Sequence, residues 1–187
     1  MSNPIFEGFP DKLYSVIYAD PPWQYNARRN LNTRFKGGAG GHYPTMPLWE
    51  ILALPVESIA DDDCALFLWT TFPYIDKQLK VFGAWGFRYR TLGFSWIKTY
   101  KNGKPFFGVG YYAKSNCEVC LLGVRGKMTP VSDSVSSVVI SERLRHSQKP
   151  AVVRERIVAL FGDVPRIELF ARREVEGWDC WGNEVQK

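Results

Sequence analysis

Long apolar runs are missing from this sequence of 187 residues. No stretch approaches the roughly 20 apolar residues that a membrane-spanning helix needs. The first 12 residues also lack the apolar core of a signal peptide. We therefore expect a cytoplasmic protein that has no membrane partner.

Cysteine and histidine are scarce, with four and two copies respectively. So few cysteines indicate a reducing compartment. Cys117 and Cys120 have the spacing of a zinc-binding pair, but a zinc site needs a second pair. The residues left to supply that pair are scattered: Cys64, Cys180, His42 and His146. We expect no metal site and interpret the cysteines as packing residues.

The common glycine-rich nucleotide-binding motifs are also missing. Four glycines lie between residues 37 and 41, but no Gly-Lys-Ser/Thr sequence follows them, which excludes a P-loop. Gly108-Val-Gly110 is a weak match to the Gly-x-Gly-x-x-Gly motif of dinucleotide-binding proteins, and it stands in the wrong context. Neither signature therefore predicts a nucleotide site.

Apolar and aromatic residues, by contrast, are plentiful. The hydrophobic fraction is 45%, which suffices for a single domain over residues 1–187 with a sizeable core. Aromatic residues make up 15% of the chain and include seven tryptophans. A small core needs fewer, so we expect some of them to line a site for a flat ligand. Lys and Arg outnumber Asp and Glu by 24 to 19, which is compatible with a nucleic-acid partner.

The chain is organised around residues 14–23, which end in a tryptophan that looks exposed. Tyr14–Ala19 is rich in β-branched and aromatic residues, and this predicts a buried strand. Pro21 and Pro22 lack amide protons, so the strand has to end at Asp20. Open α/β sheets bind ligands just beyond the carboxyl ends of their strands. Asp20 is therefore a candidate catalytic acid.

Strands and helices that alternate along the chain predict a mostly parallel sheet flanked by helices. The expected strands after the first are residues 64–70, 87–98, 118–124, a short edge strand at 138–140, and a last strand at 166–170 ahead of an irregular tail. The expected helices are residues 47–53 with Thr45 as cap, 73–85 with Ile75, Leu79 and Phe82 on one face, and 150–161. Trp85 and Trp96 are expected in the core.

Asp20-Pro-Pro-Trp23 after a strand resembles the catalytic motif Asp/Asn-Pro-Pro-aromatic of amino-group methyltransferases. Its Trp form is similar to the N6-adenine methyltransferase family that includes the catalytic subunit of the eukaryotic messenger-RNA adenosine methyltransferase and many bacterial and phage relatives. The resemblance runs from residue 14 to residue 184. Further blocks match in the expected order: His42-Tyr-Pro-Thr-Met46, Ala65-Leu-Phe-Leu-Trp-Thr70, Gly93-Phe-Ser-Trp-Ile-Lys98, His146-Ser-Gln-Lys-Pro150, Glu168-Leu-Phe-Ala-Arg172 and Gly177-Trp-Asp-Cys-Trp-Gly-Asn183.

This resemblance implies an α/β, Rossmann-like methyltransferase fold of circularly permuted order. The catalytic strand comes first and the cofactor-binding strand, here residues 167–172, comes last. It also implies S-adenosylmethionine as cofactor and Asp20, Pro21, Pro22 and Trp23 as the catalytic motif. The amine of adenine is a poor nucleophile, and the Asp20 carboxylate and the Pro21 carbonyl would accept its two hydrogens. Positioning would then supply most of the rate.

The same resemblance implies a set of cofactor-binding residues that includes Asp20. Lys149 matches the family lysine at the amino-acid end of the cofactor. A cation is unfavourable at a helix start, which favours an anionic partner over a solvated lysine. The remaining positions resemble a cofactor pocket at the end of the last strand: Glu168, Phe170, Arg172, Asn183 and Glu184. Glu184 stands where some relatives have Gln, and Phe170 and Trp181 fit either the pocket wall or the core.

Residues 24–41 have neither helical nor strand periodicity and predict a long loop directly after the candidate acid. Its basic residues, among them Arg28 and Arg29, predict a lid that contacts substrate phosphates. The alternative is a solvated loop whose charges keep the protein soluble. A base inside a duplex has to be flipped or supplied single-stranded to reach such a site. The candidates for stacking on that base are aromatic: Trp23, Tyr25 and Tyr43.

We therefore predict an S-adenosylmethionine-dependent methyltransferase that acts on N6 of adenine in DNA. The chain shows no accessory RNA-binding domain, which favours a compact bacterial or phage DNA enzyme over a messenger-RNA enzyme. Three alternatives stay open. They are the same chemistry on RNA, a small-molecule methyltransferase, and an inactive subunit that only binds nucleic acid. Inactive subunits typically lose the catalytic tetrapeptide, which is intact here. A monomer and a homodimer are both compatible with the sequence.

Overall fold

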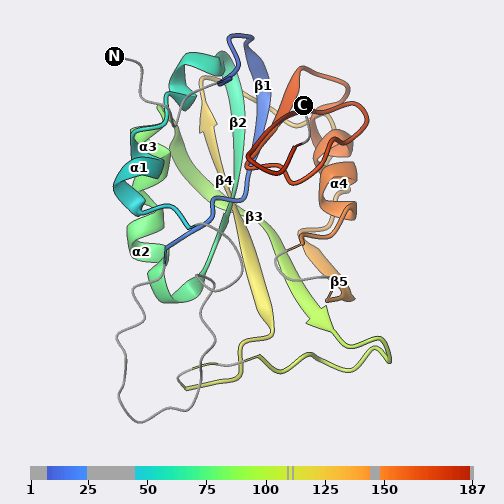
Figure 1. Cartoon of the computed structure of the whole chain (residues 1–187). Coiled ribbons are helices and arrows are strands. Elements are labelled where there is room, and N and C mark those ends of the chain that lie inside the picture. Colours follow the sequence, from blue (N-terminus) through green and yellow to red (C-terminus); the bar gives the residue numbers. More distant parts are fainter. Residues whose placement is uncertain (1–7, 25–44, 109, 111, 144–147, 186–187) are drawn as a thin grey trace.

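The computed structural model describes residues 8–24, 45–108, 110, 112–143 and 148–185. A seven-stranded sheet in the order β5-β3-β4-β2-β1-β6-β7 runs through the molecule (Figure 1). The strands are β1 Tyr14–Ala19, β2 Ala60–Thr70, β3 Arg88–Thr99, β4 Cys117–Arg125, β5 Val138–Glu142, β6 Arg166–Leu169 and β7 Asp179–Trp181. Among these described strands, β4 alone is antiparallel to its neighbours, β2 and β3, and the other pairings are parallel. The prediction of a mostly parallel sheet is confirmed.

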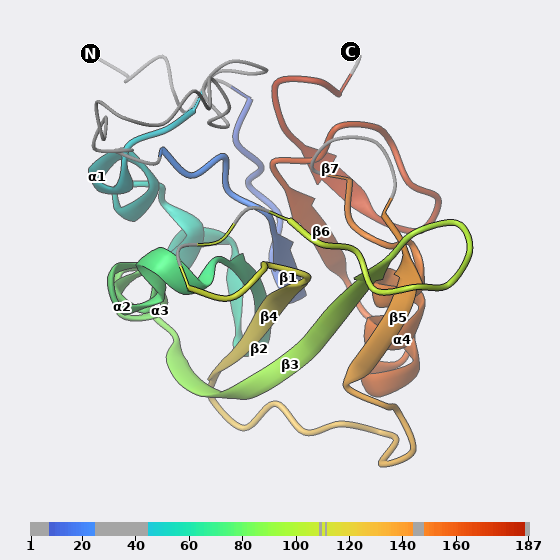
Figure 2. The same cartoon turned by 90° about the horizontal axis from the view of Figure 1, so that it is seen from below.

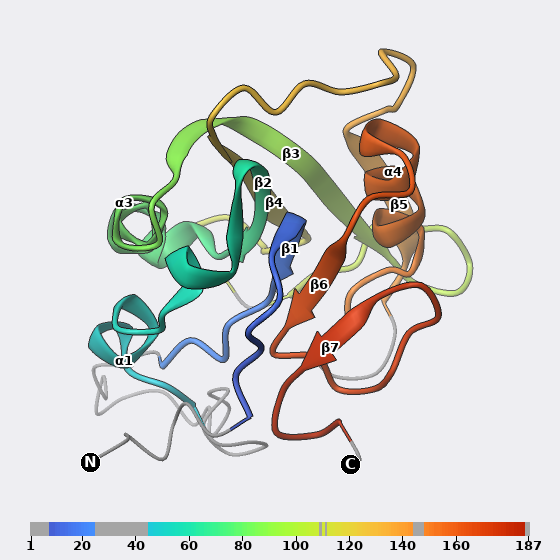
Figure 3. The same ribbon diagram turned by 90° about the horizontal axis from the view of Figure 1, so that it is seen from above.

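Helices cover both faces of the sheet. α1 Leu48–Leu52, α2 Ile75–Gln78 and α3 Lys80–Ala84 lie on one side, and α4 Val152–Phe161 lies on the other, as the views from below and above show (Figures 2 and 3). Alternate residues of a strand point to opposite faces, so each face has its own apolar cluster. Ile17 belongs to the cluster under α1 and α3, and Tyr18 belongs to the one under α4. In the part of the chain that the structure describes, no helix is long and apolar enough to cross a membrane.

The first strand and the last helix have the predicted positions. β1 pairs with β2 on one side and with β6 on the other, so it is central and buried on both faces, which explains its continuous apolar run. The helix α4 follows Pro150 and ends at Gly162, whose φ of 79° is accessible to glycine without strain. Trp85 and Trp96 are buried as predicted, with 0% and 2% of their surface exposed.

The predicted helix over residues 73–85 is broken. It consists of the 3₁₀ turn Phe72–Tyr74, then α2 and α3 with Leu79 between them. Leu79 is 36% exposed, so one member of the predicted apolar face is wrong. Gln78 is buried instead, because its side-chain oxygen accepts the backbone N–H of Thr71 at the end of β2. A polar residue with a hydrogen-bond partner thus takes a position that periodicity assigns to an apolar one.

Three smaller expectations are also wrong. The tail after β6 is not wholly irregular, since β7 adds a parallel strand beside β6. The cap of α1 is Pro47 without a side-chain hydrogen bond, and not Thr45. The strand β2 also begins at Ala60, earlier than predicted, through a stretch that contains Asp61, Asp62 and Asp63.

One edge of the sheet collects the ends of several strands. β1, β2, β3 and β6 end there, and β4 begins there because it is antiparallel to β2 and β3. We call this the carboxyl edge; it faces the lower end of the view in Figure 1. Ligands of α/β sheets bind at such edges.

Candidate active site

Asp20 follows β1 directly at the carboxyl edge, on a backbone that is held at several points. The carbonyl of Pro21 accepts the N–H of Trp23 at 2.8 Å, and the carbonyl of Pro22 accepts the N–H of Met46 at 2.8 Å. The N–H of Gln24 in turn bonds to the carbonyl of Met46 at 3.1 Å. The turn after β1 is thereby tied to the segment that leads into α1, and Asp20 stands on a fixed main chain.

Trp23 is buried, so the expectation that it is exposed is wrong. Only 7% of its surface is accessible, and its indole N–H donates to the carbonyl of Trp69 at 3.1 Å. An indole in this position anchors the turn to β2 and leaves little of its surface accessible to a base. The local sequence, a large aromatic residue after two prolines, gives no sign of the carbonyl at the end of β2 to which the indole bonds.

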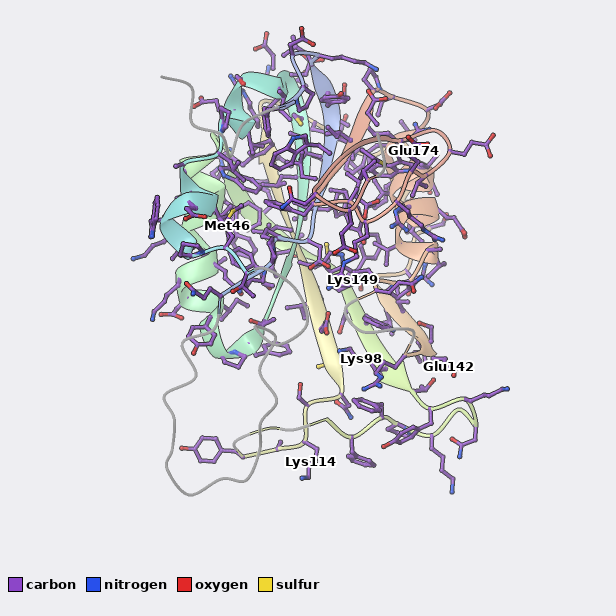
Figure 4. All side chains as sticks on the ribbon, in the orientation of Figure 1. Met46, Lys98, Lys114, Glu142, Lys149 and Glu174 are labelled. Carbon is purple, nitrogen blue, oxygen red and sulfur yellow. The ribbon has the colours of Figure 1, made fainter. Side chains whose placement is uncertain are left out.

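Lys149 lies just before α4 and reaches the carboxyl edge (Figure 4). Its ammonium nitrogen is 2.7 Å from Oδ2 of Asp20, 3.3 Å from Oε2 of Glu118 and 5.2 Å from the ring centroid of Trp69. Only 9% of the lysine side chain is exposed. The alternative of a solvated lysine is therefore wrong, and Lys149 has anionic partners within the protein itself.

Glu118 extends this arrangement to a second cation. Its other oxygen, Oε1, accepts a hydrogen bond from the ammonium of Lys98, which also lies over the ring of Trp96. Asp20, Lys149, Glu118 and Lys98 thus form a row of alternating charges, which we call the charge cluster. Two of its members are acids and two are bases, so the cluster is electrically balanced.

Sequence reasoning missed Glu118 and Lys98, although one signal was present. Glu118 stands near the start of an otherwise apolar strand, and a half-buried carboxylate in such a place is costly without a cation nearby. Lys98 is two residues beyond the buried Trp96 on β3, so strand alternation places both on the same sheet face. That these two strands meet at Asp20 follows only from the strand order.

Burial and neighbouring charges act in opposite directions on the cluster. Burial raises the pKa of Asp20 above its ordinary value, although the Lys149 ammonium acts to lower it. Burial also acts to raise the pKa of Glu118, but Lys149 and Lys98 outweigh it and hold this pKa below its ordinary value. For Lys149 burial acts to lower the pKa, and the two carboxylates raise it overall. Asp20 is therefore the acid in the cluster that gains a proton most readily.

The end of β6 approaches the same edge in an unusual conformation. Phe170 has a φ of 62°, a left-handed value that is strained for a residue other than glycine. The next residue, Ala171, bonds through its N–H to the carbonyl of Trp181 at 2.9 Å. A Cβ on Gly182 would lie 2.2 Å from the Ala171 carbonyl oxygen, so only glycine permits this approach. Backbone strain of this kind is concentrated at ligand-binding sites.

Three other residues of the implied cofactor pocket lie near this turn. Arg172 is 3.8 Å from Glu184 through Nε and Oε1, and it also acts electrostatically on Asp20. Asn183 and Glu184 are exposed. Phe170 and Trp181 contact each other edge to face, with ring centroids 5.6 Å apart, and both are partly buried against the core. This partial burial at the rim of the turn fits both the pocket wall and the core.

Glu168 differs from the rest of that set because it forms a closed pair with Arg154 of α4. The guanidinium donates to both carboxylate oxygens, at 2.6 and 3.0 Å. The side chains are only 12% and 10% exposed, and Arg154 also lies over the ring of Tyr18. With both oxygens used, Glu168 has the geometry of a link between β6 and α4.

Some predicted residues lie outside the described part of the chain. These are Tyr25, Arg28, Arg29 and Tyr43, together with His42 and His146. Within the described residues, no group of three or more His, Cys, Asp or Glu side chains has the arrangement of a metal site. Cys117 and Cys120 are separated by three positions on β4, so strand alternation directs them to opposite faces.

The fold and this site define an α/β protein whose central strand ends in an acidic residue followed by a stiff Pro-Pro turn. A second turn, strained as turns at ligand-binding sites often are, lies at the same edge of the sheet. The MT-A70 family model matches residues 14–184. The chain therefore belongs to the MT-A70 family, which confirms the family resemblance read from the sequence.

Relatives of known description extend this result. The type II methyltransferase M.MunI of Mycoplasma sp is 38% identical over 201 residues, which cover 98% of this chain and 84% of that protein. The human N(6)-adenine-specific methyltransferase METTL4 is 26% identical over 94% of this chain, and the N6-methyladenosine RNA methyltransferase MTA1 of Cryphonectria parasitica is also 26% identical over 94%. This chain spans only 38% and 52% of the length of those two proteins.

Proposed function

We propose that this protein transfers a methyl group from S-adenosylmethionine to N6 of adenine in DNA. The observation that carries the proposal is the place of Asp20: it follows the central strand at the carboxyl edge, and one of its carboxylate oxygens is held by Lys149 at 2.7 Å. Membership in the MT-A70 family and the 38% identity to a type II methyltransferase support the same reaction.

The residues at the carboxyl edge fit the proposed cofactor. Lys149 has three N–H donors, of which two face Asp20 and Glu118, so one is left for a carboxylate. The strained turn at Phe170 brings Arg172, Asn183 and Glu184 to the same edge, where they would hold the ribose and the adenine. When bound, S-adenosylmethionine supplies a methyl group activated by a sulfonium. Glu168 is less suited to this set because its side chain is only 10% exposed and Arg154 holds it in a two-bond pair.

The substrate amine needs orientation more than it needs a base. The lone pair of the adenine N6 is delocalised into the ring, and it becomes available when both N–H bonds are held by acceptors. Oδ2 of Asp20 is taken by Lys149, and the second carboxylate oxygen accepts one hydrogen of the amine. The carbonyl of Pro21 has a second lone pair beside the one that accepts the Trp23 N–H, and it accepts the other hydrogen. Positioning of this kind supplies most of the barrier reduction.

The charge cluster keeps the acceptor in the correct state. Asp20 accepts a hydrogen bond best as a carboxylate, yet burial raises its pKa. Lys149 opposes that effect, and Glu118 holds Lys149 charged and in place. Trp23 and the prolines fix the backbone, so the carboxylate does not have to be ordered when substrate arrives.

We take DNA as the preferred substrate because M.MunI, whose match covers 98% of this chain and 84% of that protein, is a type II methyltransferase. The RNA methyltransferase of Cryphonectria parasitica keeps RNA as the second candidate, at lower identity. In either case the base enters single-stranded or flipped, and Tyr25, Arg28, Arg29 and Tyr43 remain the residues that we predict to contact it. The cytoplasm of a bacterium or of a phage-infected cell is the proposed location, and a single domain over residues 1–187 in the permuted Rossmann-like order is the proposed unit.

The test is direct transfer of a labelled methyl group to nucleic acid. Duplex DNA, single-stranded DNA and RNA of matched sequence are each incubated with the protein and labelled S-adenosylmethionine, then digested to nucleosides and analysed by mass spectrometry. We expect N6-methyladenine in DNA. Label in cytosine, or label in RNA alone, would contradict the proposal, and label in no polymer would favour a small-molecule enzyme or an inactive subunit.

A further inference from the structure

The connection between β3 and β4, of which the structure describes residues 100–108, 110 and 112–116, is a basic and aromatic projection that the proposed chemistry does not use. It contains Lys101, Lys104 and Lys114 and no acidic residue. We call it the β3–β4 hairpin. Two of its aromatic side chains stand out from the protein, with Phe107 60% and Tyr112 105% exposed. Large aromatic rings normally bury most of their surface, so their exposure on one short projection needs an explanation.

Backbone hydrogen bonds hold the two limbs of the hairpin together. The N–H of Phe106 donates to the carbonyl of Lys98, and the N–H of Gly108 donates to the carbonyl of Ser115 at 2.8 Å. A Cβ on Gly108 would lie 2.5 Å from the Ser115 carbonyl oxygen, so the two limbs touch here. Phe106 faces inward, where the guanidinium of Arg143 lies 4.6 Å from its ring centroid. The exposed rings are therefore carried by a backbone that hydrogen bonds fix in place.

The position of the hairpin links it to the site. It begins directly after β3 at the carboxyl edge, and Lys98 at its base belongs to the charge cluster. Figure 4 labels Lys149, Lys98 and Lys114, which follow one another toward the lower end of the view, and Figure 2 shows the hairpin across that end of the sheet. A polymer that delivers a base to Asp20 would pass this element.

We infer that the β3–β4 hairpin binds DNA beside the target base, with its lysines on phosphates and Phe107 and Tyr112 stacked on exposed bases. The inference rests on the proposed function and names a second contact surface for the same substrate. Lysines that have no acidic residues among them suit a polyanion such as DNA, and exposed aromatic rings stack on bases of any sequence. A protein partner fits less well, because lysine is depleted in protein–protein interfaces.

Salt dependence of DNA binding tests the phosphate contacts. The variant Lys101→Ala/Lys104→Ala/Lys114→Ala is compared with Arg88→Ala/Arg90→Ala/Lys127→Ala, which removes three exposed charges at the opposite edge of the sheet. Fluorescence anisotropy with a labelled duplex at several salt concentrations gives the slope of log affinity against log salt. We expect the hairpin variant to flatten the slope by about two to three units, since each phosphate contact contributes about 0.9. The control should keep the wild-type slope.

Removal of the rings tests the stacking. Phe107→Ala/Tyr112→Ala should weaken binding of single-stranded DNA by roughly tenfold per ring that stacks, with an unchanged salt slope. Tyr89→Ala, which removes a half-exposed ring at the other end of β3, should leave it unchanged. All four variants change exposed residues, and S-adenosylmethionine affinity by calorimetry verifies that each is folded.

The outcomes separate this inference from the proposed function. Equal slopes for the two triple variants would overturn the hairpin contact even if the enzyme methylates DNA. If the wild type binds DNA but transfers no methyl group, the proposed function fails and the slopes still decide the hairpin. A wild type that binds no DNA overturns both.

Discussion

Two buried ion-pair systems flank the helix α4, and they differ in whether they are closed. Arg154 and Glu168 satisfy each other with two hydrogen bonds, and their side chains are only 12% and 10% exposed. The charge cluster is open, because Asp20 is 22% exposed and, among the described residues, only Lys149 donates a hydrogen bond to its carboxylate. A closed pair links elements of the fold, whereas an open one presents a charge for chemistry.

The energetics of the two systems differ for the same reason. A buried pair loses most stability when a single partner is removed, because the other charge is left without compensation. Arg154 depends on Glu168, which raises its pKa against the effect of burial. Lys149 has two carboxylate partners, so loss of one leaves the other. Substitutions in the open cluster should therefore change the stability of the protein little and its activity strongly.

The largest expected effect is on activity and comes from Asp20→Ala. We expect methyl transfer to slow by at least about 100-fold, the scale of losing one preorganised hydrogen-bond partner in a transition state. The melting temperature should change little, since Glu118 still pairs with Lys149. Single-turnover transfer measures the rate, with Asp163→Ala, which removes an acid that is 92% exposed, as control. Turnover within about tenfold of wild type, roughly 1.4 kcal/mol of barrier, would remove Asp20 from the assigned role.

The closed pair should show the reverse pattern. Glu168→Ala should lower the free energy of unfolding by about 3–5 kcal/mol, because Arg154 stays buried without its partner. S-adenosylmethionine affinity should remain at the wild-type value. Urea unfolding and calorimetry measure the two quantities.

A double variant, Arg154→Met/Glu168→Leu, is the matched control for that experiment. Apolar replacement of both partners removes the uncompensated charge and should recover most of the stability. Unchanged stability of Glu168→Ala together with weaker cofactor binding would return Glu168 to the cofactor pocket.

Lys149→Met tests the centre of the open cluster. Loss of the charged donor should weaken S-adenosylmethionine binding by roughly 1.5–3 kcal/mol. It should also move the acid limb of the pH–rate profile upward. Lys149 acts to lower the pKa of Asp20, so its removal lets burial and the Glu118 charge raise that pKa, and the active carboxylate is lost at higher pH. Calorimetry and a pH series measure the two effects, and no change in either would leave Lys149 a structural residue.

The smallest effect is expected from Lys98→Met, at the far end of the cluster. Lys98 acts on Asp20 through Glu118, whose pKa it helps to lower. Its loss should draw Lys149 toward Glu118 and raise the pKa of Asp20 by less than the loss of Lys149 does, with cofactor affinity unchanged. The pH–rate profile measures this, with Lys127→Met as a charge-matched control. An acid limb identical to that of the wild type would separate Lys98 from the cluster.

Several features of this protein were determined by the sequence alone. The bounds of β1 follow from an apolar β-branched run that two prolines stop, and those of α4 follow from Pro150 and Gly162. The Asp-Pro-Pro-Trp motif and the matching blocks after it were sufficient to identify the family. These signals are local, because they depend on backbone propensity and on residues within a few positions of each other.

Tertiary structure alone decided the partners of the charged residues. Asp20, Glu118 and Lys149 come from three distant segments, and the order of the strands brings them together. The same order leaves Glu168 facing Arg154 and lets the carbonyl of Trp69 capture Trp23. Sequence periodicity states which face a residue takes, but a charge is stabilised by whichever opposite charge the folded chain places within a few ångströms. The distance between two such charges is set by the strand order of the sheet and not by the local sequence of either segment.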